Sequence, residues 1–227
     1  MHRRPAPLGL RRRAPRRALP RRLESPGAPP RPGQRKRLSE ELPLFPLHTV
    51  LFPGGRLPLR IFEQRYMDMA KACLRDGAPF GVCLIRDGAE VGAPATPSEV
   101  GTLARIGTWD MPQLGLLEVV ARGEERFRIR ARRVQPDGLA LASIEVLPDE
   151  PDSTIPPSGA PLVKLLERVI EQHPELLERP HQLDSCTWVS GRLAELLPLP
   201  LPAKQALLEM GDGRLRLEKL GALVRTD

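Results

Sequence analysis

The residue types that most often do chemistry are present in this sequence but scattered. The three cysteines, Cys73, Cys83 and Cys186, show no C-x-x-C spacing, and the four histidines form no H-E-x-x-H or paired-ligand pattern. No recognisable motif joins a nucleophile, a base and an orienting group. The sequence therefore predicts no metal site, no cofactor, no disulfide framework and no catalytic residue. Scattered thiols in odd number, without a secretion signal, predict a reducing cytoplasm.

The polar group Glu63, Arg65 and Tyr66 is the most suggestive cluster, because it stands where an apolar segment becomes helix-compatible. A carboxylate and a guanidinium at such a corner can cap the helix start and lock the sheet beside it. We prefer this structural interpretation. The functional alternative is that the corner lines a face that contacts a binding partner.

The segment that leads into this cluster, residues 42–69, reads LPLFPLHTVLFPGGRLPLRIFEQRYMDM. Its four prolines cannot donate to a strand ladder, so its strands should be short, bulged or at a sheet edge. The run 48–52 has the β-branched and aromatic content of a strand. We expect two strand pieces joined by a turn at Gly54-Gly55, and then a helix with apolar positions at three- and four-residue spacing that ends at Asp76-Gly77.

The residues after this helix alternate between short apolar runs and turn chemistry. Residues 80–85 are apolar on both faces and predict an interior strand. A meander of four strands is expected at 102–109, 114–122, 126–134 and 139–147, with turns at 110–113, 123–124 and 136–138. Connections this short predict antiparallel neighbours. The predicted fold class is therefore α+β, with an antiparallel β barrel over residues 38–150 that one helix crosses.

A helical period replaces the strand pattern beyond the proline-rich linker 147–157. A first helix should begin at a Ser158 cap and stop at Pro174, and a second should run from an Asp184 cap to Leu197. A short helix at 203–210 and a fourth capped by Asp212 complete the pattern. The leucine stripes of these segments predict a four-helix unit over residues 158–225 that packs on itself and on the barrel.

Arginines alternate with apolar residues along the third strand of the meander, at Arg126, Arg128, Arg130 and Arg132. One face of this strand should be core and the other a row of guanidinium groups. A solvated face that pairs with Glu118 or Glu145 of neighbouring strands is the preferred interpretation. A stripe that binds polyanions is the alternative.

The excess positive charge of the chain, +7 overall, lies in its first 37 residues. This segment holds twelve Arg and one Lys against the single acid Glu24, together with eight prolines and no aromatic residue. Such a composition predicts a disordered basic tail. The tail is either a dispensable extension or a polycation that binds nucleic acid or anionic lipid. It has no apolar core long enough for a signal peptide, and no run in the chain is long enough for a membrane span.

Three segments of the chain resemble one family. Residues 42–69 look like the opening signature of the Lon substrate-binding domain, the N-terminal domain of ATP-dependent Lon proteases. The run VGTLARIGTWDMPQLGLLEVVARGEERFRI, Val100–Ile129, is similar to the central hairpin of that family. LPLPAKQALLEMGDGRLRLEKL, Leu199–Leu220, is similar to its short C-terminal helix. The resemblance implies a PUA-like β pseudo-barrel with one crossing helix, followed by a helical bundle.

The resemblance also bears on activity. A Lon protease needs a G-x-x-x-x-G-K-[ST] loop for ATP, and no Gly-Lys dipeptide occurs in this sequence. The Ser-Lys protease module would follow in a later domain, and the sequence ends at Asp227. We therefore expect a stand-alone, non-catalytic relative that keeps the part that handles substrates.

The function expected from the resemblance is the capture of unfolded or exposed polypeptide segments, in the context of protein quality control or proteolysis. A protease or a chaperone is the partner expected for such a module. The alternative function is that of a nucleic-acid-binding PUA-like protein assisted by the basic tail. Large apolar side chains at turns and edges and the polar corner are the expected contacts, namely Phe45, Phe52, Leu57, Phe62, Glu63, Arg65, Tyr66 and Trp109.

Overall fold

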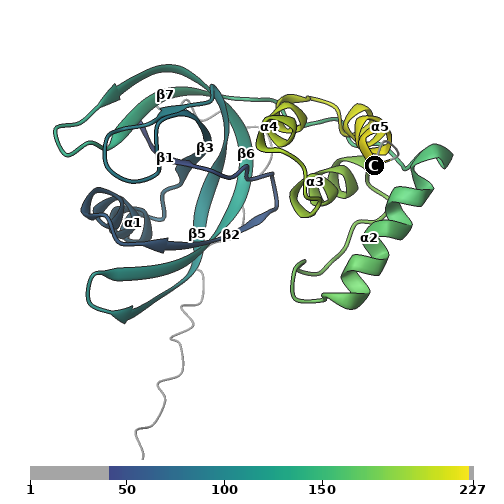
Figure 1. Cartoon of the computed structure of the whole chain (residues 1–227), viewed down its shortest axis with the longest axis horizontal. Helices are drawn as coiled ribbons and strands as arrows, with labels where there is room; N and C mark the ends of the chain where they lie inside the picture. The colour runs from purple at the N-terminus through teal and green to yellow at the C-terminus, as the bar shows by residue number, and fades with distance from the viewer. Residues whose placement is uncertain (1–40, 225–227) are drawn as a thin grey trace, which may run out of the picture. The chain divides into compact units, whose positions relative to one another are not determined.

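One long strand, β6, organises the sheet in the computed structural model, which describes residues 41–224 (Figure 1). The tail predicted to be disordered, residues 1–37, lies outside the described residues. The elements are β1 Leu42–Leu47, β2 Arg56–Ile61, α1 Gln64–Asp76, β3 Phe80–Asp87, β4 Thr96–Pro97, β5 Val100–Gln113, β6 Leu116–Val134, β7 Ala140–Val146, the 3-10 turn η1 Pro157–Gly159, α2 Ala160–Gln172, α3 Cys186–Leu196, α4 Leu201–Glu209 and α5 Gly213–Val224.

Strand β6 serves two parts of the sheet. Its first half pairs with β2 and β5, and its second half pairs with β5 and β7, in each case antiparallel. The order β1-β7-β6-β5-β3 is completed by a pairing of β1 with β3, so the chain of pairings returns to its first strand. The sheet is mostly antiparallel, as predicted. The β1–β3 pair is parallel, which the sequence analysis did not predict; the α1 crossover makes it possible.

The turn predicted at 123–124 is wrong, because Gly123 lies inside β6. Its N–H donates to the Gly55 carbonyl at 2.9 Å, and its own carbonyl accepts from the Gly54 N–H at 2.8 Å. A Cβ atom at this position would overlap the carbonyl oxygen of Phe52. Glycine is required here for the close approach of two backbones and not for a reversal of the chain.

The strand predicted at 48–52 is also wrong, since the first strand is β1 and residues 48–52 are irregular. Three side chains bind the backbone of this run instead of a neighbouring strand, the first being Glu90, whose Oε1 accepts from the His48 N–H. The Phe52 N–H donates to Glu195 Oε1 at 3.2 Å, and Thr102 Oγ1 donates to the Leu51 carbonyl at 2.6 Å. Long-range polar contacts therefore decided a segment whose local propensity favoured a strand.

The helices lie close to their predicted places, with different caps at two of the starts. Ser185, and not Asp184, caps α3, because its side chain accepts from the Trp188 N–H. Ser158 lies in η1, and α2 begins without a side-chain cap. The Asp212 prediction is confirmed, since its Oδ1 accepts from the Arg214 N–H at 2.8 Å.

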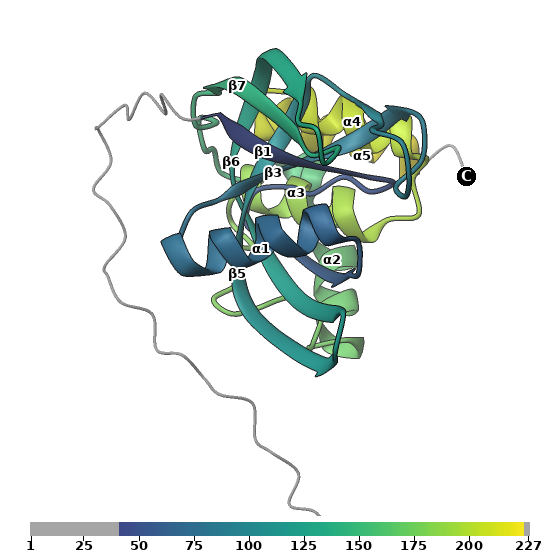
Figure 2. The same ribbon diagram turned by 90° about the vertical axis from the view of Figure 1, so that its left-hand side faces the viewer.

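Two main clusters of buried side chains divide the core. One lies between α1 and the strands, and Figure 2 shows α1 lying across them. The other joins the helices to the sheet: Phe52 and Val100 are buried together with Leu166, Leu193 and other residues of α2–α5. The helices thus pack onto the sheet through the irregular run 48–52 together with Leu84 of β3 and Val100 of β5.

A buried network of charges reinforces this contact. Arg126 Nη1 donates to the carbonyls of Leu208 and Met210 at 2.9 and 2.7 Å, and its Nε lies 3.3 Å from Glu150. Arg216 also binds Glu150, and its Nε donates to the Leu207 carbonyl at 2.8 Å. Each of these three side chains thus has an oppositely charged partner, as buried charges require, although Glu150 Oε2 itself has no hydrogen-bond partner among the described residues.

Candidate functional site

Of the eight residues expected to contact a partner, four are buried, Leu57 and Glu63 are partly buried, and Phe62 and Trp109 are exposed. Phe45 and Tyr66 are buried and stack on each other, with ring centroids 4.1 Å apart. Phe52 is fully buried under the guanidinium of Arg216. These three aromatic residues are core, so they are unable to meet a partner on the surface of the folded chain. The sequence analysis misplaced them because prolines and turns around them suggested an open edge.

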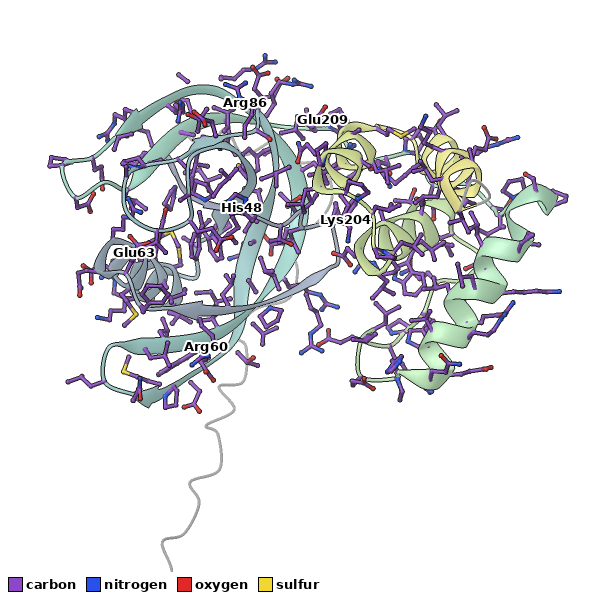
Figure 3. All side chains as sticks on the ribbon, viewed as in Figure 1. His48, Arg60, Glu63, Arg86, Lys204 and Glu209 are labelled. Atoms are coloured by element: carbon purple, nitrogen blue, oxygen red, sulfur yellow. The ribbon has the colours of Figure 1, made fainter. Side chains whose placement is uncertain are left out.

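Glu63 and Arg65 hold the start of α1 against the sheet. The buried Arg65 donates from Nη1 to the Gly138 carbonyl at 3.1 Å, and its Nη2 lies 2.9 Å from a carboxylate oxygen of Glu63. Gly138 belongs to the turn between β6 and β7, so Arg65 and Glu63 together hold that turn against the start of α1. Glu63 is labelled in Figure 3. The Glu63 side chain does not cap the helix, in contrast to the predicted capping role. Both residues have structural partners.

Two of the expected residues are well exposed. Phe62 is 58% exposed directly after β2, and Trp109 is 46% exposed on β5. Met111 and Leu114 near the tip of the β5–β6 hairpin are exposed as well, Leu114 almost completely at 98%. The sequence analysis did not name these two, because it placed Met111 in a turn at 110–113 and Leu114 at the start of the next strand. That turn prediction is wrong, since β5 continues to Gln113 and the turn lies at 114–115.

The pairing register places the exposed residues on one structural unit. Ile61 pairs with Leu117, and Leu116 pairs with Gln113, so Phe62 follows β2 next to the base of the hairpin tip. We call this unit, residues 58–62 and 106–120, the hairpin arm; Arg56 and Arg122, at the other end of the paired strands, are not part of it. Figure 2 shows the β5–β6 hairpin of this arm reaching past α1.

A cross-strand row connects Trp109 with the core. Leu59 and Trp109 both pair directly with Val119, from β2 and from β5, and directly opposed residues share a face of the sheet. Val119 is buried and Leu59 is partly buried in the cluster beneath α1. Leu57, also one of the expected residues, is partly buried in the same cluster. Trp109 is therefore the exposed member of a row of three residues in which Val119 is buried and Leu59 is partly buried.

Both outer strands of the arm offer open backbone edges. Within residues 41–224, β2 pairs with β6 alone, and residues 105–113 of β5 pair only with β6. Pro58 in the middle of β2 has no N–H to donate, which is the usual protection of an edge strand against uncontrolled pairing. An extended chain could still add to either edge.

Apart from the hairpin arm, a cavity lies where the helices meet the sheet. It has a volume of about 460 Å³ and is lined by residues from 49–57, 176–182, α3 and α4, with Arg122 of β6. We call it the junction cavity. Figure 3 shows Lys204 of α4 on the side of the helices that faces the sheet.

Glu195 is the best-buried acid of this cavity. Its Oε2 lies 3.0 Å from Arg192 Nη1, and Lys204 Nζ donates to its backbone carbonyl at 2.6 Å. Burial raises the pKa of the Glu195 carboxyl to about 7, although Arg192 and the Phe52 N–H favour the charged form. Arg192 in turn donates to the Pro53 carbonyl at 2.7 Å, so this pair ties α3 to the run before β2.

The arginine row of β6 is engaged with acids and carbonyls. Arg130 pairs with Glu145, as the preferred interpretation predicted, and Arg128 lies 3.8 Å from Glu99. Arg132 is within 3.4 Å of the Ala95 carbonyl, whereas Arg126 is buried in the network with Glu150. These partners give the row a structural explanation.

Comparison with known proteins agrees with the topology. The family model for the ATP-dependent protease La (LON) substrate-binding domain matches residues 41–226. The chain belongs to this family. The crystal structure of a Lon N-terminal domain protein from Xanthomonas campestris superposes with a TM-score of 0.68 at 39% identity, covering 81% of this chain and 98% of that one. The N-terminal domain of a Mycobacterium avium complex Lon protease shares the fold, with a TM-score of 0.59 at 19% identity, covering 80% of this chain and 96% of that one.

The curated relatives of this chain are much longer than the segment of them that it matches. Lon protease 2 of Myxococcus xanthus is 31% identical over 200 residues, which are 84% of this chain and 24% of the relative. Protein cereblon of Danio rerio is 28% identical over 114 residues, 48% of this chain and 26% of the relative. The chain thus spans about a quarter of these proteins. Among its described residues, no helix is both long and apolar enough to cross a membrane.

Proposed function

We propose that this LON-family chain is a non-catalytic module that binds unfolded or exposed polypeptide segments on the hairpin arm. The observation that carries the proposal is the clustering of four exposed large apolar side chains, Phe62, Trp109, Met111 and Leu114, on one arm. Isolated exposed apolar residues are ordinary, but a group of them beside open strand edges is typical of a contact surface.

The arm offers two kinds of interaction to an extended segment. Backbone groups of the segment can pair with the open edge of β2 or β5, which gives affinity without regard to sequence. Side chains of the segment can cover the aromatic rings of Phe62 and Trp109. Because such contacts are few and clients vary, we expect dissociation constants on the order of micromolar or weaker.

The name of the family supports polypeptide as the ligand, since it describes a substrate-binding domain of a protease. We infer a role in proteolysis or protein quality control, with a protease or chaperone as the recipient of bound clients. The three cysteines are free and buried, which fits a reducing cytoplasm as the place of action.

We also infer how the chain is divided. The closed chain of pairings with α1 across it corresponds to a PUA-like pseudo-barrel within residues 38–150. Helices α2–α5 correspond to a four-helix unit within 158–225. The charge network around Glu150 supports a rigid attachment of the two, so that the arm is held by a stable frame.

A binding experiment on the full chain tests the arm. Fluorescence anisotropy would follow a labelled, permanently unfolded model polypeptide with the wild type and with the pair Phe62→Ala and Trp109→Ala. We expect the pair to weaken binding at least tenfold. The control is Val134→Ala with Leu215→Ala, two exposed apolar residues away from the arm, which should bind as the wild type does. Equal binding by the arm pair and the control pair would contradict the proposal.

A further inference from the structure

The junction cavity carries more positive than negative charge. Five basic side chains and two acidic ones line it; they are Arg56, Arg122, Arg179, Arg192, Lys204, Glu178 and Glu195. Two carboxylates can neutralise at most two of the five basic groups. The cavity therefore keeps a positive excess even with both of its acids ionised.

Its outer acid is shared between two arginines. Arg56 and Arg122 are cross-strand neighbours on β2 and β6, and both reach the Glu178 carboxylate, at 3.3 and 3.0 Å. One carboxylate can neutralise only one guanidinium. The second guanidinium has donors left for another anion in the cavity, and a guanidinium fork suits a carboxylate in particular.

One of the side chains that line the cavity, Arg192, has a buried donor without a partner. The Arg192 side chain is 4% exposed, and its Nε has no hydrogen-bond acceptor within the described part of the chain. A buried, charged N–H without an acceptor is costly, and an acceptor supplied by a bound group would remove that cost. This observation is independent of the surface charges.

Apolar side chains form much of the remaining wall of the cavity, which also includes Thr49 and Gln182. Leu57, Leu177 and the ring of Trp188 line it, together with the exposed Leu176. A volume of about 460 Å³ lies in the range of pockets that bind small organic ligands, and it exceeds what a single ion needs. The cavity thus combines an apolar wall with guanidinium donors.

We propose that the junction cavity binds a carboxylate next to an apolar side chain in a client polypeptide. This inference rests on the proposed function, because it names one feature of the polypeptides that the module selects. The carboxylate can come from two sources: the end of a chain whose last residue is apolar, or an Asp or Glu side chain beside an apolar residue. The same donors serve both.

Three labelled octapeptides distinguish the sources. The first ends in leucine with a free α-carboxylate, the second is identical but amidated, and the third is amidated and carries an internal Leu-Glu pair. Binding of the first and not the second identifies the chain end as the ligand. Binding of the third identifies the side-chain carboxylate. Binding of none of the three at millimolar protein would overturn the proposal.

Variants locate the site on the full chain. The pair Arg56→Gln and Arg122→Gln should weaken binding of the acidic peptide roughly five- to tenfold, as expected for two partly exposed charge contacts. The matched control is Arg128→Gln with Arg130→Gln, which removes the same charge and two ion pairs from the other half of the sheet. If both double variants lost the same affinity for the acidic peptide, the effect would come from the net charge of the protein and not from the cavity, and the proposal would be overturned.

A neutral probe separates this inference from the proposed function. An amidated peptide with aromatic residues and no acids should bind the arm, and so lose affinity in the pair Phe62→Ala and Trp109→Ala but not in Arg56→Gln and Arg122→Gln. If the neutral peptide behaves in this way while no acidic peptide responds to the arginine pair, the arm proposal stands and the cavity proposal fails. If the neutral peptide does not bind and the acidic one responds to the arginine pair, the reverse holds.

Discussion

The hairpin arm and the junction between helices and sheet are built from the same strands but in opposite ways. At the junction, Phe52 is fully buried, Arg192 and Glu195 tie α3 to the sheet, and backbone groups have long-range partners. On the arm, Phe62 and Trp109 are exposed and strand edges are open. Rigidity is concentrated where the parts of the protein join, and adaptable surface is left where a variable client can be met.

Phe52 at the junction and Phe62 on the arm give the sharpest test of this contrast, and the larger effect is expected at Phe52. Phe52→Ala should lower the free energy of unfolding by about 3–5 kcal/mol, because it opens a cavity under Arg216 between sheet and helices. Urea unfolding followed by circular dichroism would measure it. A loss below about 1 kcal/mol would show that the junction is loosely packed.

Two glycines extend the comparison to the backbone. Gly123→Ala should cost about 2–3 kcal/mol, since the new methyl group would overlap the Phe52 carbonyl. Gly107→Ala on the arm is the matched control, because its nearest neighbour would be 3.6 Å away, and it should be neutral within about 0.5 kcal/mol. Thermal melts of the two variants at one protein concentration would show whether the order holds.

The buried acid of the junction predicts a pH dependence with a defined sign. Because the pKa of Glu195 is raised to about 7 from 4.5, the folded state holds its proton more tightly than the unfolded state does. The stabilisation from this carboxyl is complete below pH 4.5 and is lost as pH rises to about 7, by on the order of 1–3 kcal/mol.

The variant Glu195→Gln isolates that contribution from other titrating groups. The free energy of unfolding of the wild type minus that of the variant should decrease between pH 5 and pH 8. Urea titrations at several pH values would measure this difference. A difference that rises with pH would mean that the Arg192 pair outweighs burial and holds the carboxyl ionised.

The smallest expected effect on stability is on the arm. Phe62→Ala and Trp109→Ala should each change the free energy of unfolding by less than about 1 kcal/mol, because roughly half of each side chain is already in water. Binding should fall in the same variants. A large loss of stability would assign these residues to the fold and remove the contrast between the two regions.

The sequence predicted those features that depend on local pattern. Apolar spacing located α1 and the four later helices within a few residues, and turn chemistry at 136–138 marked the β6–β7 connection. It could not show that Gly123 is a point of close contact, since turn and contact glycines look alike until Phe52 is placed beside it. The same limit applied to the site: burial of Phe45 and Phe52 depends on α1 and α3–α5, which are distant in sequence.

The placement of β1 has a consequence for biosynthesis. This strand pairs with β3 on one side and with residues 140–142 of β7 on the other. On a ribosome, the side of β1 that faces β7 therefore stays open until the whole of residues 42–142 has been synthesised. Contacts between residues so far apart slow folding and prolong the exposure of apolar strands. A polypeptide-binding module of this topology is thus itself a candidate client of chaperones while it is being made.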